Sequence, residues 1–197
     1  MNYSKKIISE VCDVLPGYAA RGKLEVADAG GVQGVQLRDV TPFGEIEFAK
    51  VSAYALAGNL DRYRLAQGDV VFRSRGEWTT AAAIMEAPER LLIAIMPVFI
   101  LRPKAPGLDP RYLAWAINEP AGQRSLDEKA QGGGLRMVAK SALETLEIAL
   151  PDIKTQRRIV ELADLARKES DLLQALASKR FSLNTALLSR SARGRIH

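Results

Sequence analysis

Most of the last quarter of the chain lacks the two residues that most often end a helix. No Pro or Gly occurs from Ile153 to Ser189, and the leucines recur at helical spacing. At 1.5 Å per residue this helix would be roughly 55 Å long, more than a globule of this size can cover. We therefore expect it to pack against another long helix. The residues predicted to form its contact face are Ile159, Leu162, Leu165, Leu172, Leu176, Leu183 and Leu187.

Two charged residues, Glu169 and Arg180, interrupt a strict heptad on this helix. The leucine pattern is closer to a period of 3.6 than of 3.5. The sequence therefore favours a bundle formed with helices of other subunits over a bare two-stranded coil.

The positive charge of the chain is concentrated in the same region. Residues 151–197 hold ten Lys and Arg against five Asp and Glu, whereas residues 1–150 hold eighteen of each, so the net charge of +5 comes from the end. A basic surface favours a polyanionic partner.

Nothing in the composition indicates a membrane or an oxidising compartment. The longest apolar run, Leu91–Leu101, is interrupted by Pro97 and is too short to span a bilayer. The first residues lack the apolar core of a signal peptide, since Glu10 and Asp13 follow quickly. Cys12 is the only cysteine and cannot form an internal disulfide. A cytoplasmic location is expected.

The first 150 residues alternate short β-like runs with turn signals, which predicts one α+β domain. We expect a curved, mostly antiparallel sheet and short helices, followed by the long C-terminal helix. Asp109-Pro110 predicts a helix start, with a capping carboxylate and Pro at the first position. A second helix is expected at 122–129, and Ser141 is predicted to cap a short turn through Glu144. The predicted strands are 32–37, 45–48, 70–72, 81–85 and 98–101.

The chain carries four motifs, at 68–76, 109–113, 132–134 and 150–160, and together they resemble those of the specificity subunits of type I restriction-modification systems. The clearest is a strand ending in Leu150-Pro151, followed by Gln156 and by Ile159-Val160 at the head of the long helix. The family usually has Glu before this Gln, where the chain has Thr155. The other landmarks, in the family's order, are Gly68-Asp69-Val70-Val71-Phe72-Arg73-Ser74-Arg75-Gly76, Asp109-Pro110-Arg111-Tyr112-Leu113 and Gly132-Gly133-Gly134.

This resemblance covers about residues 30–189 and implies a function. The subunits of the family read a two-part DNA target for a methyltransferase, and in some systems for a restriction motor. The chain has room for one recognition domain, 1–151, and one helix, 152–197, so it resembles a half-length form. The resemblance implies an antiparallel homodimer through the long helix, with double-stranded DNA, a methyltransferase subunit and a restriction subunit as partners.

The first candidate for reading bases follows a predicted strand. An Arg fork fits the O6 and N7 atoms of guanine, and Thr can contact a thymine methyl group or a phosphate. The alternative is an ordinary solvated hairpin in which Trp78 covers the edge of the core. The residues of this candidate are Arg73, Arg75, Trp78, Thr79 and Thr80.

The second candidate surrounds the triple glycine, where a backbone without side chains can approach a phosphodiester closely. The resemblance implies that this loop lies near DNA; the alternative is a flexible surface loop. Its residues are Arg124, Gln131, Gly132, Gly133, Gly134, Arg136 and Lys140.

The residues offer little for catalysis, and we expect no catalytic residue, metal or cofactor. The only histidine is His197, so neither a catalytic triad nor a zinc site has an internal candidate. Two alternatives remain open. One is a metal-dependent nuclease using Asp127 or Asp152, and the other is an adaptor whose long helix binds only protein.

Overall fold

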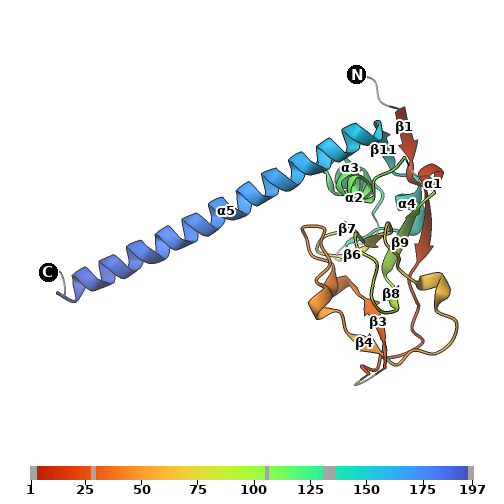
Figure 1. Ribbon diagram of the computed structural model, residues 1–197, viewed down its shortest axis with the longest axis horizontal. Coiled ribbons are helices and arrows are strands. Elements are labelled where there is room, and N and C mark those ends of the chain that lie inside the picture. Colours follow the sequence, from red (N-terminus) through yellow and green to blue (C-terminus); the bar gives the residue numbers. More distant parts are fainter. Residues whose placement is uncertain (1–3, 28–29, 105–106, 131–135, 195–197) are drawn as a thin grey trace. The chain divides into compact units, whose positions relative to one another are not determined.

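A computed structural model describes the 197-residue chain except for residues 1–3, 28–29, 105–106, 131–135 and 195–197 (Figure 1). The chain divides into two units, Met1–Arg157 and Arg158–His197. The first unit holds the sheets and the short helices, and the second holds most of the long helix.

A four-stranded antiparallel sheet forms the centre of the first unit. Its strands, in spatial order, are β2 (Cys12–Pro16), β9 (Val98–Pro103), β5 (Val70–Arg73) and β7 (Thr80–Ala83). The apolar runs of β5 and β9 are buried on both faces, because successive side chains point to opposite sides and both kinds are covered. Cys12, at the start of β2, is 1% exposed, and this burial raises the pKa of its thiol to about 12.

A second sheet of three strands shares a core with the first. It has the order β4 (Ala53–Tyr54), β3 (Val32–Val35) and β8 (Leu92–Ala94), and β3 pairs with β8 in parallel. Val35 and Leu92 from this sheet pack with Val71 and Ile100 of the four-stranded sheet. Two further pairs are β1 (Ser4–Ile7) with β11 (Glu147–Leu150), and β6 (Arg75–Gly76) with β10 (Arg136–Met137).

The short helices follow the capping signals in part. In α2 (Pro110–Asn118), the Asp109 carboxylate accepts a hydrogen bond from the Arg111 N–H at 2.9 Å, and Pro110 takes the first helical position, as predicted. α2 packs on β7 and is followed by α3 (Pro120–Glu128). The short helices α1 (Ile8–Val11) and α4 (Lys140–Glu144) complete this unit, together with the 3₁₀ helices η1 (Leu37–Asp39), η2 (Phe48–Lys50) and η3 (Asp61–Tyr63).

The α+β class is confirmed, but several details differ from the sequence-based expectation. The described strands form four sheets instead of one curved sheet. The strand predicted at 45–48 is wrong, since only Ile46 forms a bridge, with Val40, before the chain enters η2. Ser141 does not cap α4, because that helix begins at Lys140 and Ala139 occupies the N-cap.

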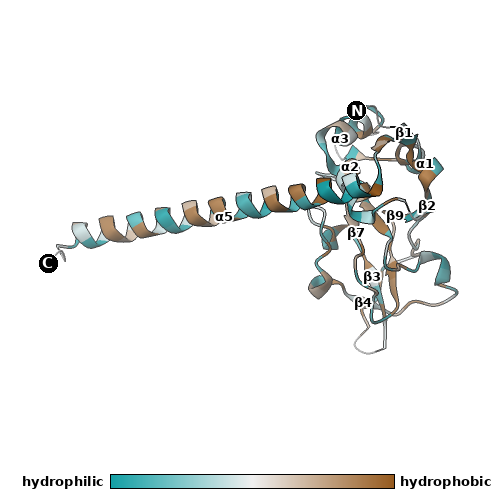
Figure 2. Ribbon diagram, turned by 45° about the horizontal axis from the view of Figure 1, so that its top comes forward, coloured by the Kyte–Doolittle hydropathy of each residue, from teal (hydrophilic) through white to brown (hydrophobic). Residues whose placement is uncertain are grey.

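The predicted long helix is confirmed as α5 (Ile153–Ala192), whose 40 residues extend about 60 Å. The Asp152 carboxylate begins it by accepting hydrogen bonds from the N–H groups of Lys154 and Thr155, both at 3.0 Å. These bonds and one from the Thr155 hydroxyl hold the pKa of Asp152 below its ordinary value. Apolar and polar bands alternate along α5 (Figure 2), and every described side chain from Lys168 onward is exposed.

The described part of the chain contains no helix that is long and apolar enough to cross a membrane.

Candidate nucleic-acid interface

The two segments singled out in the sequence lie side by side in the first unit. β6 and β10 form a two-stranded ribbon in which Arg136 pairs with Gly76 and Met137 with Arg75. The Val138 N–H extends the pairing by donating to the Ser74 carbonyl at 2.8 Å. Gly76 has a φ of +123° and lies against the Arg73 guanidinium, where a Cβ atom would be 2.7 Å from Nη2. Glycine is therefore required at this turn.

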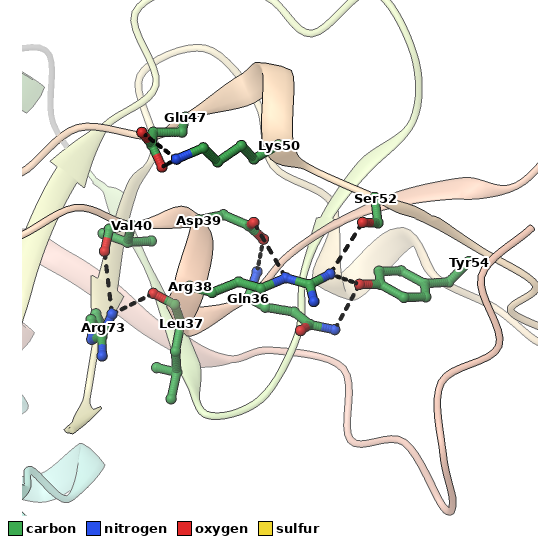
Figure 3. A network of polar contacts seen from close by, with 10 residues as sticks. All are labelled: Gln36, Leu37, Arg38, Asp39, Val40, Glu47, Lys50, Ser52, Tyr54 and Arg73. Atoms are coloured by element: carbon green, nitrogen blue, oxygen red, sulfur yellow. Dashed lines mark hydrogen bonds and ion pairs between the residues drawn. The ribbon is translucent and has the colours of Figure 1, made fainter.

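Arg73 is half-buried and its guanidinium is held by main-chain groups. Nη1 donates to the Leu37 carbonyl at 2.6 Å and to the Val40 carbonyl at 3.4 Å (Figure 3), and Nε donates to the Arg75 carbonyl at 3.3 Å. The guanidinium also lies over the Trp78 ring, 4.3 Å from its centre. Burial lowers the pKa of Arg73 below its ordinary value. Arg73 thus fixes the strand end to a neighbouring turn, and its contact with DNA stays a prediction.

Thr79 and Thr80, which were predicted to face DNA, have partners inside the first unit. The Thr79 hydroxyl donates to Oε1 of Gln123 at 3.1 Å, and the Thr80 hydroxyl donates to Oδ1 of Asn118 at 3.2 Å. Both threonines are buried, and Trp78 is half-buried. These contacts tie the start of β7 to α2 and α3. A role of these side chains in DNA binding remains untested.

The basic residues around the triple glycine differ in how freely their side chains can reach a ligand. Arg136 forms an ion pair with Asp127 and donates to Oε1 of Gln123 at 3.2 Å. Lys140 is exposed and lies 3.0 Å from the Glu144 carboxylate, and Arg124 is exposed on α3. The remaining predicted residues, Gln131, Gly132, Gly133 and Gly134, lie outside the described residues.

A polar cluster that the sequence analysis missed lies on η1 and β4. Nη2 of Arg38 donates to the Tyr54 hydroxyl at 2.7 Å and to the Ser52 hydroxyl at 3.1 Å (Figure 3). Nε2 of Gln36 donates to the same Tyr54 hydroxyl at 3.0 Å. The Arg38 side chain is 59% exposed. The only sequence signal for this cluster is a Gln and an Arg two positions apart, at the end of the strand predicted for residues 32–37.

The side chain of Asp39 stabilises the turn that carries Gln36 and Arg38. Its buried carboxylate accepts a hydrogen bond from the Gln36 N–H at 2.8 Å and caps η1. Burial raises the pKa of Asp39 above its ordinary value, while the hydrogen bond from Gln36 opposes this change. Arg73 bonds to carbonyls of this turn and to that of Arg75, so the segments bearing the exposed Arg38 and Arg75 are neighbours.

Replacing Arg73 by alanine is expected to lower the free energy of unfolding of the first unit by about 2 kcal/mol. The change removes the stacking on Trp78 and leaves the Leu37 carbonyl without its charged donor. Urea denaturation followed by tryptophan fluorescence measures the loss. Arg75→Ala, at an exposed neighbour, is the matched control and should change stability by less than about 0.5 kcal/mol. Equal effects of the two changes would contradict the anchoring role of Arg73.

Asp127 and Asp152, the carboxylates considered for a metal-dependent nuclease, both have structural partners. Asp127 pairs with Arg136, and Asp152 caps α5. Within the described residues, no three His, Cys, Asp or Glu side chains are grouped closely enough to hold a metal ion.

Comparison of the fold with solved structures gives a consistent match. A chain of a type I R-M system has a TM-score of 0.68 and 19% identity, covering 98% of this chain and 46% of its own length. The HsdS subunit from Thermoanaerobacter tengcongensis has a TM-score of 0.65 and 17% identity, with coverages of 96% and 48%. The chain has the fold of type I specificity subunits.

A third structure with this fold is the type I restriction-modification S subunit from M. genitalium. It has a TM-score of 0.53 and 15% identity, and the match covers 96% of this chain and 45% of that one. The chain thus spans about half the length of the solved chains that share the specificity-subunit fold. No family model matches the sequence, and no curated protein does.

Proposed function

We propose that the chain is a non-catalytic DNA-binding specificity subunit of a type I restriction-modification system. The observation that carries the proposal is the specificity-subunit fold over almost the whole chain. The first unit adds a surface suited to DNA, because Arg38 and Arg75 are exposed on adjacent segments fixed by Arg73. Their planar forks can contact guanine edges or phosphates.

In this proposal the first unit reads one half of a two-part target, and α5 joins it to the other components. The exposed leucines of α5 would pair two copies of the chain, so that the target would be an inverted repeat. Phe181 and Leu188, which are 74% and 71% exposed, widen the apolar surface beyond a two-stranded contact. This additional surface is suited to a methyltransferase subunit, and a restriction subunit would join through that complex.

Sequencing the methylated sites in a host that carries the chain with its methyltransferase subunit tests the proposal. The expected result is methylation at one inverted-repeat motif with a fixed spacer. This methylation should disappear when the gene for the chain is deleted. DNA binding by the purified chain should also weaken steeply with salt, because phosphate contacts release counterions. Binding to protein alone, with no salt-dependent affinity for DNA, would favour the adaptor alternative.

Replacing Arg75 by alanine is expected to weaken binding to the cognate site about tenfold and to relax the preference at one base position. The reason is the loss of a single bidentate contact worth about 1–3 kcal/mol. Lys140→Ala is the matched control, since loss of a phosphate contact should weaken all sequences alike. Fluorescence anisotropy on cognate and substituted duplexes gives both quantities. An unchanged preference after Arg75→Ala would remove Arg75 from the proposed interface.

A further inference from the structure

α5 carries a second apolar pattern beside the stripe of Leu165 and Leu172. Positions spaced alternately by three and four residues lie in one line along the helix, and this spacing is typical of a coiled-coil seam. We name this line the α5 seam. Its members are Ile159, Leu162, Ala166, Glu169, Leu173, Leu176, Arg180, Leu183, Leu187 and Arg190.

The α5 seam is symmetric about one point, midway between Gln174 and Ala175. Each seam position on one side of this point has a seam position at the same distance on the other side. The pairs related in this way are Leu173 with Leu176, Glu169 with Arg180, Ala166 with Leu183, Leu162 with Leu187, and Ile159 with Arg190. The acidic residue that interrupts the apolar pattern is therefore matched with a basic one.

We propose that two copies of the chain pair through their α5 seams in an antiparallel register centred between Gln174 and Ala175. In this register Glu169 of each copy lies opposite Arg180 of the other, and two ion pairs flank a central layer of Leu173 and Leu176. Both charged side chains are exposed on α5, and neither forms an ion pair within the described part of the chain. A second copy is the partner because it supplies the complementary charges at the required spacing.

Other registers of the same helix are less favourable. A parallel, in-register pair would place Glu169 against Glu169 and Arg180 against Arg180, which is repulsive. An antiparallel pair shifted by one heptad would place both charged residues opposite leucines and leave the charges without partners. Polar residues inside an apolar seam commonly select one register in this way, at some cost in stability. Glu169 and Arg180 are therefore the residues that set the alignment.

This inference rests on the homodimer of the proposed function and is independent of DNA binding. Leu165 and Leu172 lie on one flank of the α5 seam, and Phe181 and Leu188 lie on the other side, further round the helix. A two-stranded contact along the seam leaves part of these flanks available. The bundle with enzyme helices and the antiparallel homodimer are therefore compatible.

Sedimentation velocity on the full-length chain over a range of concentrations tests the register. The wild-type chain should dimerise, and Glu169→Arg or Arg180→Glu should each raise the dimer dissociation constant on the order of 100-fold, because both ion pairs become repulsive. The double variant E169R/R180E should restore dimerisation to near the wild-type level. An equimolar mixture of the two single variants should form heterodimers, since their charges are then complementary.

Charge changes outside the α5 seam are the matched controls. Asp171→Arg and Lys168→Glu alter the net charge by the same amounts and should change the dissociation constant by less than about threefold. A dimer that is equally stable in all these variants would overturn the register and leave the homodimer intact. A wild-type chain that remains monomeric would overturn both, whereas salt-dependent binding to DNA would still support the reading role of the first unit.

Discussion

Replacing Gln156 by alanine is expected to lower the free energy of unfolding of the first unit by about 3–5 kcal/mol. Gln156 is fully buried, and its side-chain amide forms hydrogen bonds with three main-chain groups. Oε1 accepts from the Asp109 N–H at 2.9 Å, while Nε2 donates to the carbonyls of Gly107 at 2.9 Å and Pro151 at 2.8 Å. Each buried polar group left unpaired costs about 1–3 kcal/mol.

Tryptophan fluorescence is well suited to this measurement. Both tryptophans of the chain, Trp78 and Trp115, lie in the first unit, so a urea titration reports its unfolding without a signal from the rest of α5. Gln174→Ala, at an exposed position of the same helix, is the control and should be neutral within about 0.5 kcal/mol. A loss below 1 kcal/mol for Gln156→Ala would mean that water replaces the amide without penalty.

Replacing Arg102 by alanine is expected to destabilise the same unit by about 2–4 kcal/mol. Asp69 is 2% exposed, and Arg102 binds both of its oxygens, Nε to Oδ1 at 2.8 Å and Nη2 to Oδ2 at 2.7 Å. These hydrogen bonds raise the pKa of Arg102 above its ordinary value. Removing the guanidinium leaves a buried carboxylate without its counter-charge. Because the Arg102 side chain is 40% exposed, water can enter and moderate the loss.

A double-mutant cycle isolates this pair. Asp69→Asn combined with Arg102→Ala should cost less than the sum of the two single changes, with a coupling of about 1–3 kcal/mol. Arg102→Lys keeps the charge but loses the fork, and it should fall between alanine and the wild type. Additive effects in urea titrations would show that the two side chains do not stabilise each other.

The residues changed or contacted in these two predictions include landmarks of the sequence analysis. Gly68-Asp69 and Gln156 belong to the landmarks that resemble type I specificity subunits, and both have roles in the fold. Gly68 has a φ of +92°. The Asp69 carboxylate that follows accepts a hydrogen bond from the Ala66 N–H at 2.8 Å and also binds Arg102. The Gly68 turn and the Asp109 and Asp152 caps depend on neighbouring residues and could be predicted directly. The partners of Gln156 near position 108, and Arg102 as the partner of Asp69, lie far away in the sequence and could not.

Features that depend on distant residues could not be read in this way. β1 pairs with β11 across most of the first unit, and its polar sequence, Ser4-Lys5-Lys6-Ile7, gives little sign of a strand. Two partners of Arg73 are the carbonyls of Leu37 and Val40, which no spacing rule connects to it. Its base-reading role is a prediction from side-chain type, from its place after a strand and from the family resemblance, and none of these indicates the exposed cluster around Arg38. The expected domain boundary after Pro151 stays a prediction, although Gln156 contributes to the first unit.

Within the described part of the chain, the Arg73 guanidinium is anchored by main-chain acceptors and not by other polar side chains. The guanidinium bonds to the carbonyls of Leu37, Val40 and Arg75, and every amino acid supplies the same carbonyl. The exposed side chain of Arg75 can therefore be exchanged while the anchor keeps its acceptors, whereas Leu37 and Val40 are constrained by their packing in the core. Under the proposed function, a lineage could acquire new target preferences by point mutation at Arg75 without rebuilding the scaffold that displays it.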